Sequence, residues 1–99
     1  MAKNKIVTVK DKVTFRKWCN QMHFSTKQAA AVLDVSRSNI YKYLELKSGI
    51  ELRGPIVLLC NLISELPGKE RMDFIQNRLA ESNETEHWPA EVPLSESVD

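Results

Sequence analysis

Residues 25–44, STKQAAAVLDVSRSNIYKYL, decide the fold that this sequence predicts. Two serines, Ser25 and Ser36, each precede a short segment with apolar residues at helical spacing. A serine hydroxyl in that position accepts a hydrogen bond that the first turn of a helix leaves unmade. The apolar positions of the two segments are Ala29, Ala30 and Leu33, and then Ile40, Tyr43 and Leu44. We therefore expect two short helices, each of which buries one face.

A tight turn is expected between these two helices. Asp34 and Val35 stand between the first apolar segment and Ser36. Aspartate tolerates a left-handed backbone better than most residues, and Val35 can fill the corner between the helices. The small side chains of Ala29 and Ala30 allow two steeply crossed helices to approach each other closely. The stretch thus predicts a helix-turn-helix.

Three further helices are predicted around this motif. A helix before the motif has Trp18 on its apolar face, where a large aromatic side chain is expected to anchor the core. After the motif, Gly49 is expected to end the second helix of the pair, and Pro55 fits the first turn of the next helix. The predicted ranges are 13–23 before the motif, and 56–66 and 69–80 after it. The fold class is therefore all-α with five helices.

The two ends of the chain differ from its middle. Residues 1–12 hold four lysines and the β-prone string Ile6–Val9, which indicates either a flexible basic arm or a short strand. Residues 82–99 are acidic, contain two prolines and lack periodicity, so we expect a disordered tail in which Trp88 is a candidate docking point. The predicted helix-turn-helix domain comprises residues 13–81, between these two ends.

The overall charge conceals a polarised chain. The formal net charge is +1. Residues 1–80 contain 14 Lys and Arg against 7 Asp and Glu, a balance of +7, whereas residues 81–99 contain 6 acids and no Lys or Arg, a balance of −6. A basic body is what an anionic partner such as DNA requires, although the same charges can simply solvate a surface.

Several classes of protein are disfavoured by what the sequence lacks. Cys19 and Cys60 lie on apolar faces and are expected to be reduced, buried thiols, while His23 and His87 have no zinc-type spacing. The longest apolar run, Ile56–Cys60, is far shorter than the roughly 20 residues of a membrane span, and no secretory signal is evident, so we expect a cytoplasmic protein. No catalytic or cofactor-binding motif is present, and we expect neither an enzyme nor a cofactor.

Residues 13–80 resemble the phage repressor and Cro (XRE) family of helix-turn-helix transcriptional regulators. The segment GPIVLL, residues 54–59, is similar to a pattern that follows the motif in short regulators, including antitoxins. The chain departs from the family at Asp34, where a glycine is usual, and in the longer connection Glu45–Gly49. The positions that carry the resemblance are Ala30, Leu33, Val35, Ser36, Ile40 and Tyr43.

This resemblance implies a five-helix repressor-like domain that represses transcription by binding double-stranded DNA. Such domains usually bind a palindromic operator as a homodimer. The recognition helix, about Ser36–Leu46, is expected in the major groove, where Arg37 matches O6 and N7 of guanine. The residues expected to read bases are Arg37, Ser38, Asn39, Tyr41 and Lys42. Those expected to contact phosphates are Thr26, Lys27, Gln28, Ser36, Lys47, Ser48 and Arg53.

Three alternatives stay open from the sequence. The motif also resembles that of excisionase and MerR-type proteins, which continue into a β-wing. An antitoxin or anti-repressor would use the acidic tail to hold another protein, with DNA binding serving autoregulation. The tail can also screen the basic face of its own chain and so compete with weak DNA sites.

Overall fold

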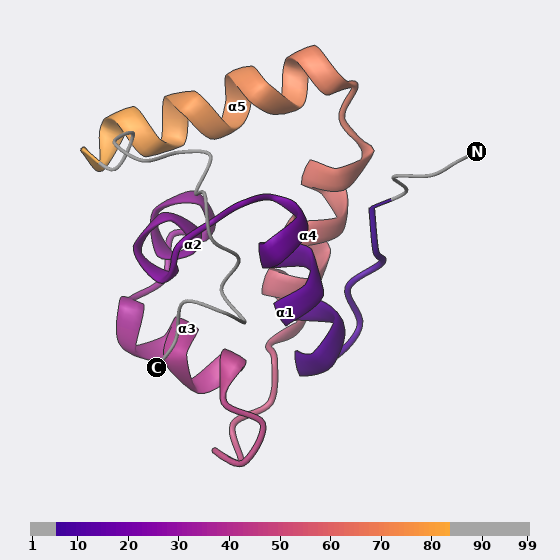
Figure 1. Cartoon of the computed structure of the whole chain (residues 1–99), viewed down its shortest axis with the longest axis vertical. Helices are drawn as coiled ribbons and strands as arrows, with labels where there is room; N and C mark the ends of the chain where they lie inside the picture. Colours follow the sequence, from indigo (N-terminus) through magenta and orange to yellow (C-terminus); the bar gives the residue numbers. More distant parts are fainter. Residues whose placement is uncertain (1–5, 84–99) are drawn as a thin grey trace.

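The computed structural model describes residues 6–83, which form five helices (Figure 1). They are α1 (Lys12–Gln21), α2 (Thr26–Leu33), α3 (Arg37–Leu44), α4 (Gly54–Glu65) and α5 (Gly68–Glu81). The prediction of an all-α fold is confirmed. No strand occurs in the described part of the chain, so the strand predicted as one alternative for Ile6–Val9 is wrong. The predicted acidic tail from residue 84 onward, with Trp88, lies outside the described residues, as do residues 1–5.

In the core, α2 packs against α3, α4 and α5, and α1 packs against α3 (Figure 1). Trp18 is fully buried, and its ring lies 5.7 Å from that of Phe24 and 6.4 Å from that of Phe15. The indole N–H donates a hydrogen bond of 2.7 Å to Oγ of Ser64, which joins α1 to α4. The prediction that Trp18 anchors the core is confirmed.

Side-chain caps start the first three helices. Ser25 accepts a hydrogen bond from the backbone N–H of Gln28, whose side chain accepts one from the N–H of Ser25. Ser36 accepts one from the N–H of Asn39. Both predicted caps are confirmed, and each satisfies an N–H that has no partner within its helix.

A third cap was not predicted from the sequence. Asp11 and Thr14 cap each other reciprocally, and α1 therefore begins at Lys12, one residue before the predicted start. The hydrogen bonds from the Thr14 N–H and hydroxyl favour the charged carboxylate and lower the pKa of Asp11.

The turn between α2 and α3 depends on the backbone of Asp34. This residue has φ 60° and ψ 46°, the left-handed conformation that the sequence analysis allowed for an aspartate. The backbone N–H groups of Asp34 and Val35 both donate to the carbonyl of Ala30. The reversal therefore ends α2 with its last carbonyls partly satisfied and brings α3 across it.

The predicted end of α3 is wrong. The helix ends at Leu44 and reaches neither Leu46 nor Gly49, because Glu45 has an extended backbone. Gly49 does have a positive φ of 80°, but it lies within the loop that connects α3 to α4. Arg16 of α1 donates a hydrogen bond of 2.9 Å to the carbonyl of Leu44, and this contact stabilises the early end.

Two other arginines have the same role as Arg16. Arg71 of α5 donates to the carbonyls of Ser64 and Leu66 at the end of α4. Arg78 of α5 donates to the carbonyls of Ala31 and Val32 at the end of α2. A cation is favoured at a helix carboxyl end because the last carbonyls carry partial negative charge. Each of these three arginines thus ties one helix to the end of another.

Residues 6–10 are extended and packed on the helices. The side-chain amide of Asn61 in α4 accepts from the N–H of Val9 and donates to its carbonyl, both at 2.9 Å. The N–H of Val7 donates to the side chain of Gln21 in α1. Val9 is buried in the core. The arm predicted as the other alternative is therefore held against α1 and α4 at residues 6–10.

The cysteines behave as predicted. Cys19 and Cys60 are free and buried, and burial raises the pKa of Cys60 to about 12 and that of Cys19 well above its usual value. Within residues 6–83, no group of three His, Cys, Asp or Glu side chains could hold a metal ion. No helix there has the length and apolar composition needed to cross a membrane.

Candidate nucleic-acid interface

The two faces of α3 differ in character. Ile40, Tyr43 and Leu44 are buried, and Tyr43 meets Phe15 of α1 edge to face at 6.1 Å. The other face carries the predicted base-reading residues, of which Arg37, Ser38, Tyr41 and Lys42 are exposed and Asn39 is half-buried. The spacing that buries one stripe of α3 therefore presents the other to solvent as a polar surface.

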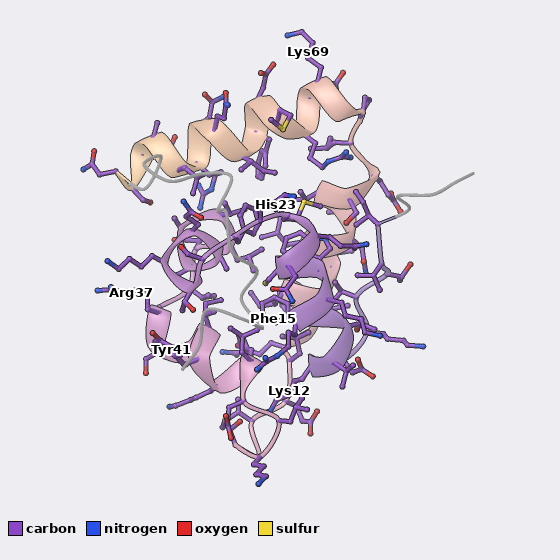
Figure 2. All side chains as sticks on the ribbon, in the orientation of Figure 1. Lys12, Phe15, His23, Arg37, Tyr41 and Lys69 are labelled. Carbon is purple, nitrogen blue, oxygen red and sulfur yellow. The ribbon has the colours of Figure 1, made fainter. Side chains whose placement is uncertain are left out.

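Arg37 and Tyr41 extend from the same outer side of the molecule (Figure 2). Tyr41 is 62% exposed, so it does not pack against the body. The side chains of Arg37 and Lys42 have no hydrogen bond or ion pair with any other described residue. Their charged groups are available to a ligand without the loss of an internal contact.

The predicted phosphate-contacting residues divide into two groups. Lys27, Ser36, Lys47 and Arg53 are exposed, and Thr26 is half-buried at the start of α2. Lys27 and Thr26 lie in the first turn of α2, where free N–H groups and the positive end of the helix dipole favour an anion. This group has the exposure that a phosphate contact needs.

Two members of the predicted set are occupied within the protein instead. Gln28 is only 2% exposed, because its side chain turns back to cap Ser25. Ser48 accepts hydrogen bonds from Nζ of Lys12 and the N–H of Ile50, and donates one to the carbonyl of Lys42. Gln28 and Ser48 therefore shape the backbone around the helix pair and are not free surface groups, while their contact with phosphate stays a prediction.

Some of the cationic side chains counted from the sequence form contacts inside the protein. Arg16, Arg71 and Arg78 bind backbone carbonyls, and Lys12 is buried against Ser48. The partners of Arg16, Arg78 and Lys12 lie on distant segments, so no spacing in the sequence marks those contacts, whereas Arg71 binds carbonyls five and seven positions earlier. The exposed cations of the helix pair and the loop after it are Lys27, Arg37, Lys42, Lys47 and Arg53.

A shallow hollow of about 270 Å³ lies beside the turn between α2 and α3. Lys27 and Arg37 stand at it with one carboxylate, that of Asp34, and the end of α5 reaches it through Ser82. Its remaining lining residues are Ala30, Ala31 and Val35. The hollow is not visible in the sequence, because α5 is brought to α2 only by tertiary packing.

Comparison of the chain with models of protein families, with curated proteins and with solved structures gives no match.

Proposed function

We propose that the protein is a sequence-specific DNA-binding transcriptional regulator of the repressor type, with no enzymatic activity. In this proposal α2, the turn and α3 act as a helix-turn-helix, and α3 lies in the major groove. The observation that carries the proposal is the exposed polar face of α3, on which Arg37 and Lys42 have no internal partner while three arginines elsewhere are held by carbonyls. Unpaired cationic side chains on one short helix favour an anionic ligand, and the major groove of DNA also presents base edges with donors and acceptors that these side chains can recognise.

In this arrangement the exposed cations have separate tasks. Arg37 reads a guanine, with Asn39 and Tyr41 beside it, and Lys27 contacts a phosphate from the start of α2. Lys47 and Arg53 contact the backbone beyond the end of α3. Five exposed cations lie near the interface, and they set an upper limit on the salt dependence. A plot of log affinity against log salt concentration should have a negative slope whose magnitude is at most about 4.5 per protomer.

A homodimer on a palindromic operator is part of the proposal. Leu58 and Leu62 lie one turn apart on α4 and are 60% and 51% exposed. Exposed leucines at this spacing form an apolar strip of the kind that helices bury between subunits. A two-fold dimer through α4 would present two recognition helices to two half-sites.

The proposal is tested by selecting a binding site from a random double-stranded DNA library with the full chain. We expect an enriched, symmetric sequence containing guanine. Substitution Arg37→Ala should then reduce the ratio of specific to non-specific affinity by roughly 5- to 150-fold, the value of one bidentate contact of about 1 to 3 kcal/mol. Lys27→Ala should weaken binding to all sequences alike and reduce the salt slope by about one unit.

Lys69→Ala is the matched control, because Lys69 lies at the start of α5, far from Tyr41 in Figure 2, and its ion-pair partner among residues 6–83 is Asp73. It removes the same charge and should leave the affinity ratio unchanged. The proposal fails if no sequence is enriched, or if Arg37→Ala and Lys69→Ala change the ratio equally.

A further inference from the structure

The end of α5 lies at the hollow beside α2 and α3. Ser82 lines the hollow, and Asn83 has a left-handed backbone with φ 58°. The N–H of Asn83 donates to the carbonyl of Ala80, so the helix stops and the backbone reverses at this point. Figure 1 shows this end of α5 next to α2. The described chain therefore ends next to the hollow that Lys27 and Arg37 line.

The segment that follows Asn83 in the sequence is opposite in charge to the hollow. Residues 84–99 contain four glutamates, one aspartate and no lysine or arginine. The hollow presents two cations, Lys27 and Arg37, against the single carboxylate of Asp34. Sixteen residues can span at most about 53 to 58 Å at 3.3 to 3.6 Å each, whereas the longest extent of the body is 36 Å. Reach therefore does not limit contact with this surface.

We propose that residues 84–99 bind the hollow of their own chain and pair their carboxylates with Lys27 and Arg37. The attachment at Ser82 makes this an intramolecular contact with an effective concentration in the millimolar range, which favours it over an equivalent separate peptide. Both cations are exposed and have no internal partner among the described residues, so pairing costs no existing contact. Because the surrounding surface is open, the contact is weak in salt.

A functional consequence follows if the proposed DNA binding holds, and only this part of the inference rests on it. The tail and a DNA backbone would compete for the same two cations. A tail that occupies the hollow nine-tenths of the time lowers the apparent DNA affinity about tenfold. The apparent affinity for every DNA sequence falls by this same factor. At a protein concentration that still saturates the strong sites, the loss of occupancy falls on weak, non-specific DNA.

The contact is tested without DNA, by paramagnetic relaxation in the full chain. Ser95→Cys gives a site for a nitroxide label, and the buried native thiols, whose pKa values are raised, should stay unlabelled near neutral pH. At low salt we expect broadening of the amides of Lys27, Asp34 and Arg37 and none at Lys69. Broadening should disappear in the double variant Lys27→Gln with Arg37→Gln, and should persist in Lys69→Gln.

Uniform broadening over all faces, or broadening that persists in the Lys27→Gln and Arg37→Gln variant, would overturn the proposal. Neutralising the tail with Glu84→Gln, Glu86→Gln, Glu91→Gln and Glu96→Gln should also remove the signal. The same variant should bind random DNA about tenfold more tightly at low salt. If neither chain bound DNA while the broadening pattern was as expected, the proposed function would fail and the tail contact would stand.

Discussion

Replacement of Asn61 by alanine tests how the first residues of the described chain are held. The Asn61 amide makes two hydrogen bonds of 2.9 Å with the N–H and carbonyl of Val9. Asn61→Ala removes both bonds at once without adding bulk. Val9 itself is 1% exposed, so its backbone groups lie against the core and have limited access to water.

The expected loss of stability is about 2 to 4 kcal/mol. Each net hydrogen bond contributes about 0.5 to 1.5 kcal/mol, and a buried group left without a partner costs about 1 to 3 kcal/mol. A domain of this size has a total free energy of unfolding of about 5 to 15 kcal/mol. The substitution should therefore shift the midpoint of urea unfolding clearly while the chain still folds.

Urea unfolding of the full chain measures the loss, and amide hydrogen exchange locates it. Protection of the Val9 amide should fall in Asn61→Ala, while amides in α5 should lose only the amount set by global stability. Asn77→Ala is the matched control, because Asn77 is exposed on α5 and makes none of the hydrogen bonds described above. A difference between the two variants below about 0.5 kcal/mol would refute the role assigned to Asn61.

Two further predictions concern the thiols and the turn. Burial raises the pKa of Cys60 to about 12 and that of Cys19 well above 9, so both thiols should stabilise the fold below pH 9 and lose this contribution as pH rises toward 12. Urea unfolding at pH 8 to 10.5 should compare wild type with the double variant Cys19→Ala and Cys60→Ala. The free energy of unfolding of wild type should fall, relative to that of the variant, by up to about 1.4 kcal/mol per thiol per pH unit. A difference between the two proteins that stays constant with pH would contradict this prediction. Asp34→Ala should lose about 1 kcal/mol because alanine tolerates the left-handed backbone poorly, whereas Asp34→Gly should lose none, and equal losses would show that the turn imposes no such cost.

Local sequence signals predicted most of the helices. Ser25 and Ser36 act through hydrogen bonds to residues three positions away, so the positions of these caps are visible in the sequence. The apolar stripe that contains Ile40 and Tyr43 predicted which face of α3 is buried. Such features depend on neighbours along the chain, which a sequence displays directly.

Most of the features that were not predicted from the sequence depend on distant partners, although the cap formed by Asp11 and Thr14 is local. The end of α3 at Leu44 is stabilised by Arg16, 28 positions earlier. Val9 and Asn61 meet across 52 positions. Gln28 binds Ser25, three positions away, at the Ser-x-x-Gln spacing of a capping box, so this contact was visible in the sequence. Ser48 binds Lys12, 36 positions earlier, and no local pattern marks that contact. For the candidate site, the exposed face of α3 was predictable, and the hollow at its side was not.

The arginines at the helix ends have a consequence for any attempt to isolate the motif. A peptide of residues 25–44 would keep both serine caps and would leave behind Arg16 and Arg78, which close α3 and α2 at their carboxyl ends. Each helix would then be eight residues long, well below the 12 to 15 at which isolated helices become marginally stable. The motif is therefore continuous in the sequence, but the parts that complete it are supplied by the first and the last helix.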